Sequence, residues 1–156
     1  MWRWARRVLL GVAALLAIFV VLLVVTPQGR AAAKAALFIP QVLPDIPVTP
    51  LEWITGDPVY VEVTYPLADG EGVADLYLPA GSGQHSAVLF FQGVVPGGRF
   101  DPRMVALAEG LARSGMAVMV PWSDTQGDER INTGDIDNLV RGFQYLSSHE
   151  RIDPER

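Results

Sequence analysis

The chain has 156 residues, a net charge of −5 and no cysteine, so it can form one modest domain but neither disulfides nor zinc–thiolate sites. The charge is divided unevenly. Residues 1–44 carry five basic side chains and no acid, whereas residues 45–156 carry all 17 acids and seven basic side chains, a net charge of −10. Because phosphate contacts need clustered Lys and Arg, such an acidic body disfavours nucleic-acid binding, and we expect no nucleic-acid partner.

The N-terminal part has the pattern of a membrane anchor. Residues 1–7 form a basic N-terminus with Arg3, Arg6 and Arg7, and residues 8–25 are an uncharged apolar run. As a helix, this run spans roughly 27 Å, close to the thickness of the hydrocarbon layer. We therefore predict a single-pass anchor in the lipid bilayer at residues 8–25, with the N-terminus cytoplasmic and the body extracytoplasmic. The alternative is secretion after signal cleavage near the alanines at 31–33, although the apolar run is longer than a usual signal core.

Residues 26–58 are predicted to be a proline-rich spacer. Prolines at this density disfavour a helix that continues past Pro40 and favour extended chain. The segment also contains large apolar residues, among them Leu51 and Trp53. We expect part of it to pack on the following domain, because a free linker has no use for such side chains.

The predicted domain covers residues 59–156. Residues 59–65 and 73–78 alternate with a period of two and flank a turn at 69–72, which predicts an antiparallel hairpin. Residues 87–91 and 116–120 are continuously apolar, as in a parallel sheet covered by helices. A helix is expected between them, from Asp101 and Pro102 to Gly115. A last helix, at about 134–148, has one apolar face. Its members are Ile136, Leu139, Val140, Phe143 and Leu146. This order is typical of the α/β class.

The same order resembles the N-terminal half of the α/β-hydrolase fold, in its dienelactone-hydrolase-like branch, over residues 59–156. The resemblance is carried by VYVEVTYPLADGEGVADLYLPAG, AVLFFQGVVPGG, LAEGLARSGMAVMVP and LVRGFQYLSSHERIDPER. It implies a partial hydrolase sheet, in which an antiparallel hairpin precedes parallel strands with crossover helices. The final Asp-Pro-Glu-Arg resembles the bend that leads into the nucleophile strand. We therefore expect the chain to cover the part of the domain before the catalytic elbow.

The resemblance also implies a site in the loop after residues 87–91. In this family the loop supplies one backbone N–H of the oxyanion hole. Mapped onto this sequence, the donor is Val94, with Gly93 beside it. A preset N–H of this kind stabilises the transition state by roughly 3–4 kcal/mol. Many members have His-Gly where this chain has Gln92 before Gly93, a departure found in relatives of dienelactone hydrolase. The alternative is that Gly93, Gly97 and Gly98 only form a turn.

The catalytic residues themselves are expected to be absent from this chain. None of its serines lies in a Gly-x-Ser-x-Gly elbow, and there is no cysteine to replace the serine. His85 fits a turn and His149 a helix end, so neither is assigned to a catalytic triad. The acids after residue 122 fit no calcium loop, and we expect no metal and no cofactor. These acids are Asp124, Asp128, Glu129, Asp135 and Asp137.

We therefore expect a membrane-anchored relative of hydrolases that cleave ester or lactone bonds of small molecules with a Ser or Cys nucleophile, with this chain alone inactive. The alternative is a non-catalytic, membrane-tethered interaction module whose partners include a chain that supplies the missing half. A nucleotide-binding domain is a third option, but the chain has neither Gly-x-Gly-x-x-Gly nor a P-loop. Without a neighbouring strand, residues 87–91 become an apolar sheet edge, so residues 59–156 alone are predicted to be poorly soluble.

Overall fold

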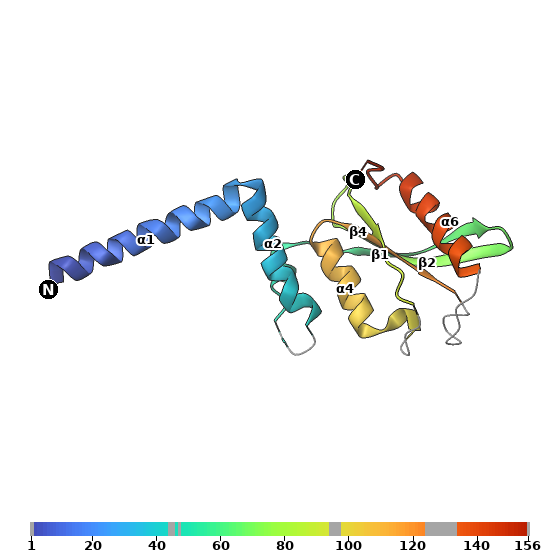
Figure 1. Ribbon diagram of the computed structural model, residues 1–156, viewed down its shortest axis with the longest axis horizontal. Helices are drawn as coiled ribbons and strands as arrows, with labels where there is room; N and C mark the ends of the chain where they lie inside the picture. The colour runs from blue at the N-terminus through green and yellow to red at the C-terminus, as the bar shows by residue number, and fades with distance from the viewer. Residues whose placement is uncertain (1, 44–45, 47, 94–97, 124–133, 156) are drawn as a thin grey trace. The chain divides into compact units, whose positions relative to one another are not determined.

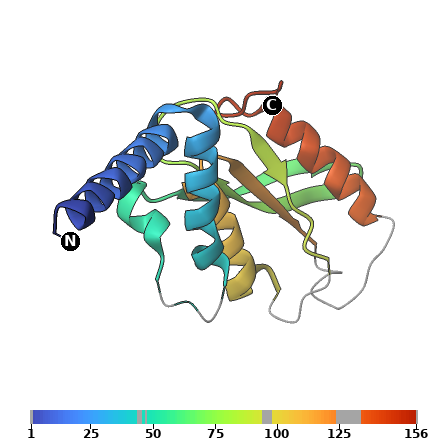
Figure 2. The ribbon, with the colours of Figure 1, turned by 60° about the vertical axis from the view of Figure 1, so that its left-hand side comes forward.

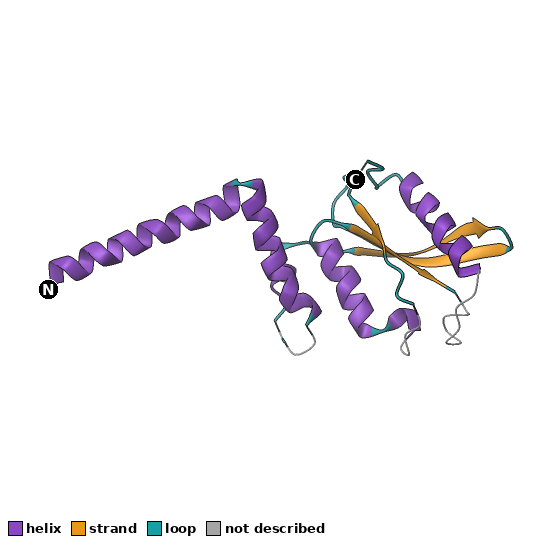
Figure 3. Cartoon of the chain, viewed as in Figure 1, coloured by secondary structure: helices purple, strands orange, loops and turns teal. Residues whose placement is uncertain are grey.

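A computed structural model describes residues 2–43, 46, 48–93, 98–123 and 134–155. The chain divides into two compact units, Met1–Leu37 and Phe38–Arg156. Figure 1 shows the order of the helices and strands, and Figure 3 distinguishes them by type. The first unit is helical, whereas the second contains a sheet with helices.

The first unit contains helix α1 (Trp2–Val25) and most of α2 (Pro27–Val42). Residues Trp4–Val25 of α1 form a helix of 22 residues that is long and apolar enough to cross a membrane, and none of its apolar window is buried. Thr26 separates the two helices. Its Oγ1 accepts a hydrogen bond from the Gly29 N–H at 3.0 Å, and Pro27 takes the first helical position, so α2 begins with a complete N-cap.

The sheet has the order β1-β2-β4-β3. Strands β1 (Val59–Leu67) and β2 (Gly70–Leu78) form the predicted antiparallel hairpin, and β4 (Ala117–Trp122) pairs antiparallel with β2. Strand β3 (Ala87–Leu89) pairs in parallel with β4, as predicted for the two apolar segments. The register leaves only residues 68–69 unpaired, so the hairpin turn is tighter than the one predicted at 69–72. The α/β class predicted from the sequence is confirmed.

Helices cover both faces of this sheet. Helix α4 (Pro102–Arg113) lies on one face and α6 (Gly134–Ser148) on the other (Figures 1 and 2). Because side chains alternate along a strand, Met119 packs with Leu146 of α6, whereas Val118 packs with Ala108 of α4. Met119 is fully buried, and a side chain of this size contributes about 1.5–3 kcal/mol when it leaves water.

The predicted ends of α4 are confirmed. The Asp101 carboxylate accepts the Arg103 N–H at 3.0 Å, which is an N-cap contact, and Pro102 is the first helical residue. Gly115 follows the helix with φ of +101°, a conformation that favours glycine and ends the helix. A short 3-10 helix, η1 (Gly98–Phe100), precedes α4 and was not predicted.

Two expectations about the helices are wrong. Helix α2 continues through Pro40, which lies in its last turn, where the lost N–H donor affects only the helix end. Only part of the apolar face expected on α6 packs on the sheet, because Leu146 is buried whereas Ile136, Val140 and Phe143 are exposed. The buried positions form a stripe that shares only Leu146 with the expected face. They are Asp135, Asn138, Gly142 and Leu146.

Part of the proline-rich segment packs on the domain, as expected. The short helix α3 (Pro50–Ile54) contacts α4, and its Leu51 is fully buried. The Arg113 guanidinium donates to the Gly56 carbonyl at 3.3 Å and forms an ion pair with Asp57 at 2.8 Å. These contacts fix the chain between α3 and β1 to the end of α4.

Candidate functional site

The candidate site lies at the carboxyl ends of the parallel strands β3 and β4. The Phe90 N–H still donates to the Met119 carbonyl at 2.8 Å, so the two chains stay together just beyond Leu89. Gln92 and Gly93 then follow β3, and Trp122 is the last residue of β4. In open α/β sheets, ligands bind outside the carboxyl ends of parallel strands.

Gly93, one of the two predicted oxyanion-hole residues, has a distinctive backbone. Its φ is +67°, in the left-handed region that side chains other than glycine rarely adopt. A methyl group on its Cα would meet no atom of the described residues within 4 Å, so backbone conformation rather than crowding calls for glycine here. The second predicted residue, Val94, lies outside the described residues.

The Gln92 amide has no hydrogen-bond partner within the part of the chain that the structure describes. Its Oε1 and Nε2 are both buried, and neither has a hydrogen-bond partner among the described residues. Buried polar groups are rarely left in this state, because each unmade hydrogen bond costs about 1–3 kcal/mol. The side chain therefore offers a donor and an acceptor beside Gly93. The sequence identified Gln92 only as a departure from the more common His.

The loop after β3 returns to the end of β4. Gly98, the first residue of η1, has φ of +61°, and a methyl group on it would lie 3.4 Å from Cη2 of Trp122. The backbone of η1 thus lies against the Trp122 ring. This contact brings the C-terminal end of the loop to the same edge of the sheet as Gln92.

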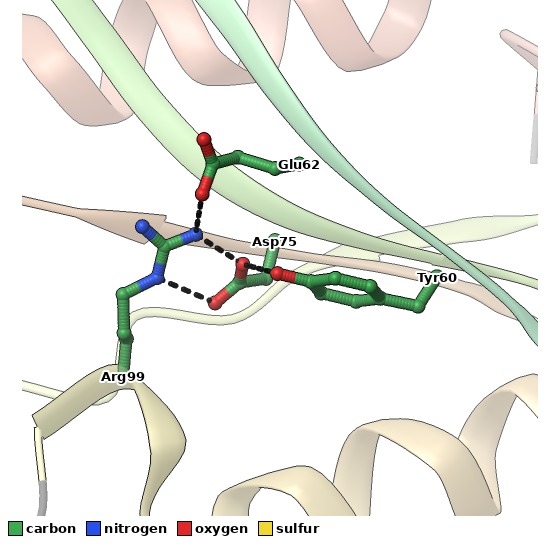
Figure 4. Close-up of polar contacts among 4 residues, drawn as sticks. All are labelled: Tyr60, Glu62, Asp75 and Arg99. Atoms are coloured by element: carbon green, nitrogen blue, oxygen red, sulfur yellow. Dashed lines mark hydrogen bonds and ion pairs between the residues drawn. The ribbon is translucent and has the colours of Figure 1, made fainter.

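Arg99 fixes η1 to the hairpin (Figure 4). Its Nε donates to Asp75 Oδ2 at 3.1 Å and its Nη2 donates to Asp75 Oδ1, so the pair is bidentate. Nη2 also contacts Glu62 at 2.9 Å, and the Tyr60 hydroxyl donates to Asp75 at 2.8 Å. The Asp75 side chain is 1% exposed. The hydrogen bond to Asp75 raises the pKa of Arg99. Burial is the main cause that raises the pKa of Tyr60, and the hydrogen bond to Asp75 adds to it.

The register of the hairpin explains why a cation is needed there. Glu62 and Asp75 are direct cross-strand partners, and like charges in this arrangement are destabilising. Arg99 lies between both carboxylates and compensates for part of their charge. The alternation of the two strands could have identified the acidic pair, but no local pattern indicated that Arg99 joins it.

A second polar network joins the end of β4 to the start of α6. The Ser123 hydroxyl donates to Asp135 at 2.7 Å, and the Asn138 amide donates to the Trp122 carbonyl at 3.0 Å. The Tyr65 hydroxyl donates to Asn138 Oδ1 at 2.5 Å. Burial raises the pKa of Tyr65 to about 12, so this hydroxyl remains a donor at neutral pH.

The acids expected in this region have local structural contacts where the structure describes them. Asp135 contacts Ser123, and Asp137 accepts the Ala68 N–H at 3.0 Å and pairs with Arg141 at 3.4 Å. Asp124, Asp128 and Glu129 lie outside the described residues. Within the described part of the chain, no group of three His, Asp or Glu side chains is placed to hold a metal ion.

Both histidines contact Arg151, at the opposite end of β3 from Gly93. His85 precedes β3, and its Nε2 lies 3.5 Å from the Arg151 guanidinium. His149 Nδ1 accepts the Arg151 N–H at 3.2 Å. Neither ring therefore lies with the loop that follows β3.

The outer edge of β3 accepts a parallel chain at one point. His85 and Ile152 form a parallel bridge, in which the His85 N–H donates to the Arg151 carbonyl and the Asp153 N–H to the His85 carbonyl, both at 2.9 Å. Beyond this bridge, the edge pairs with no other described residue. A cavity of about 140 Å³ lies beside it, with Leu89, Phe143 and Pro154 among its lining residues.

No protein-family profile matches the chain, and no curated protein sequence matches it. Among solved structures, it is similar to a protein named m3DLH, with 18% identity and a TM-score of 0.48 over 65% of this chain and 48% of the other. It is also similar to dienelactone hydrolase from Anabaena variabilis ATCC 29413, with 20% identity and a TM-score of 0.48 over 60% of this chain and 47% of the other. The chain thus spans about half the length of the solved structures that it matches.

Proposed function

We propose that this chain is the oxyanion-loop half of a membrane-anchored α/β hydrolase that cleaves carboxylic ester or lactone bonds of a small-molecule substrate. The observation that carries the proposal is the pair Gln92 and Gly93. Gly93 has a left-handed backbone where the loop leaves a parallel strand, and the Gln92 amide beside it is buried without a partner among the described residues. In α/β hydrolases, the loop after the third strand supplies an N–H of the oxyanion hole.

In this proposal, the loop acts on the negative charge that develops during acyl transfer. Attack of a nucleophile on the substrate carbonyl gives a tetrahedral intermediate with a charged oxygen, and the Val94 N–H donates to that oxygen. Gly93 allows the backbone to turn toward the substrate. The Arg99–Asp75 pair holds the other end of the loop against the hairpin. A Ser or Cys nucleophile, a His base and an acid come from residues other than those of this chain.

The anchor is part of the same proposal. Helix α1 crosses the bilayer, with Arg6 and Arg7 on the cytoplasmic side and the sheet outside. The length and apolar character of Trp4–Val25 support the crossing. The basic N-terminal flank supports the orientation.

Hydrolysis by the native protein tests this function. An antibody against residues 59–156 would precipitate the protein from detergent-solubilised source membranes, and hydrolysis of p-nitrophenyl acetate and of an aryl lactone would be measured. We expect the native precipitate to hydrolyse at least one substrate, whereas the recombinant 156-residue chain does not. No hydrolysis by the native precipitate would contradict the proposed reaction, and hydrolysis by the recombinant chain would contradict the residue assignment.

A non-catalytic, membrane-tethered interaction module is the second candidate. It is favoured by the open edge of β3 beside an apolar side of α6, where Ile136, Val140 and Phe143 are exposed. Such a surface fits a partner chain that adds a strand in parallel. The same precipitate distinguishes the two candidates, because this module would co-precipitate a second polypeptide without hydrolysing either substrate.

A further inference from the structure

The stretch from the end of α2 through α3 has both buried and exposed apolar residues. Six large apolar side chains between residues 39 and 54 are exposed, and Trp53 and Ile54 are 74% and 65% exposed. Single exposed apolar residues are ordinary, but several of them within one short stretch of chain point to a contact surface. We define the outer face by these six residues. They are Ile39, Leu43, Ile46, Val48, Trp53 and Ile54.

The segment belongs to the second unit, and its buried residues pack on α4. Leu51 is fully buried where α3 packs on α4, and Gly110 of α4 lies against Phe38 and Gln41 of α2. The Gln41 amide also donates to Glu52 at 3.3 Å. This hydrogen bond ties the end of α2 to α3, which are neighbours in Figure 2. The exposed residues of the two helices therefore flank one contact.

We propose that the outer face lies in the headgroup region of the bilayer that α1 crosses, and that it seats the second unit on the membrane. The proposal rests on the anchoring by α1 and adds a second contact to it. Trp and aliphatic side chains suit the membrane–water interface. There the apolar part of the indole can contact lipid while its N–H stays hydrogen-bonded to water. The exposed carboxylate of Glu52 fits this depth, because the headgroup region is hydrated.

The short chain distance between α1 and the outer face favours the bilayer as the partner of this face. Ile39 follows the last residue of α1 by 14 residues, roughly 21 Å at the helical rise, so the tether keeps the face close to lipid. Because the tether fixes the local concentration, even a weak interfacial contact is populated.

The chain has no cysteine, so single nitroxide labels report on the full chain directly. The variants Trp53→Cys and Ile54→Cys would be spin-labelled and placed, one copy per disc, in nanodiscs of phosphatidylcholine and phosphatidylglycerol. Collisions with oxygen, which concentrates in lipid, would be compared with collisions with a water-soluble nickel chelate. Leu15→Cys in α1 is the lipid-buried reference. Ile136→Cys in α6 is the matched reference for an exposed apolar position, with 64% exposure.

We expect the oxygen-to-nickel ratio at positions 53 and 54 to be several-fold higher than at 136, and lower than at 15. A ratio at 53 and 54 equal to that at 136, with position 15 shielded from nickel, overturns the inference and leaves the anchor intact. Access of nickel to position 15 overturns the anchor as well. Shielding of 53 and 54 from both reagents indicates a protein contact and also contradicts the inference.

A second measurement keeps the face testable if a label itself inserts into lipid. Trp53 and Ile54 would both be changed to Ser in a chain labelled at Ile39→Cys. Because both side chains are exposed, the fold should be unchanged by circular dichroism. Loss of the two anchors should raise nickel access at position 39 several-fold, and unchanged access would contradict the proposal.

Discussion

Removal of Arg99 tests whether the loop after β3 is fixed to the hairpin. The change Arg99→Ala leaves the Asp75 carboxylate, which is 1% exposed, without its bidentate partner. Breaking a buried ion pair on one side costs about 3–5 kcal/mol. The Tyr60 hydroxyl still donates to Asp75 after the change, and the contact with Glu62 is partly exposed. We therefore expect Arg99→Ala to lower the free energy of unfolding by about 3 kcal/mol, at the lower end of this range.

The assay is urea unfolding of the full chain in detergent micelles, followed by the fluorescence of Trp122. The other three tryptophans would be replaced by Phe, so that the signal comes from the ring that lies against η1. Arg141→Ala is the matched control, because Arg141 pairs with Asp137 at i, i+4 and is 48% exposed. Such an exposed pair contributes about 0.3–0.5 kcal/mol.

A double variant separates the lost ion pair from lost packing. Asp75→Asn removes the buried charge, so the variant with both Arg99→Ala and Asp75→Asn should be more stable than Arg99→Ala alone. Equal stability of Arg99→Ala and the Arg141→Ala control would refute the reasoning. A double variant less stable than Arg99→Ala would show that the charge of Asp75 is not the source of the cost.

Three further predictions concern pH, backbone conformation and solubility. Burial raises the pKa of Tyr65 and of Tyr77 to about 12, so absorbance at high pH should show two tyrosines that titrate near pH 12. Stability should fall as pH rises from about 10 to 12, because the unfolded chain ionises first in this range. Gly93→Ala should cost about 1–2 kcal/mol, because φ at this residue is +67°. Phe143→Lys, at a site 62% exposed, should raise solubility and change stability by less than about 0.5 kcal/mol.

Each of these predictions has its own control. Replacing Tyr65 and Tyr77 by Phe should remove their share of the late absorbance change and leave that of Tyr60, whose pKa is also raised; an unchanged amplitude would contradict the assignment. Gly83→Ala is the control for Gly93, because a methyl group there meets nothing within 4 Å and the backbone is not left-handed. An equal loss in both glycine variants would refute the backbone argument. Unchanged aggregation of the Phe143→Lys variant would show that the exposed apolar side of α6 does not drive aggregation.

Local signals in the sequence predicted most elements of the fold. Alternation predicted the hairpin, continuous apolar runs predicted β3 and β4, and Asp101 and Gly115 marked the ends of α4. Periodicity failed for α6, because it shows which residues share a side but not which side meets the sheet. There, Gly142 lies against Tyr65, whereas Val140 faces outward.

The site was only partly predictable for a similar reason. The resemblance to α/β hydrolases directed attention to Gly93, whose left-handed backbone supports a turn at that point. The Arg99–Asp75 pair joins residues 24 positions apart and depends on the register that places Glu62 opposite Asp75. No local pattern encodes such a contact, since it appears only when the strands are paired and η1 is placed beside them.

The most direct test of the central claim is the sequence of the coding DNA immediately downstream of the codon for Arg156. If this chain is the oxyanion-loop half of a hydrolase, the frame should encode a strand for the open edge of β3. A Gly-x-Ser-x-Gly elbow or its Cys form should follow, and then an Asp and a His. Absence of such a segment, both in this frame and in an adjacent gene, would contradict the account and favour the interaction module.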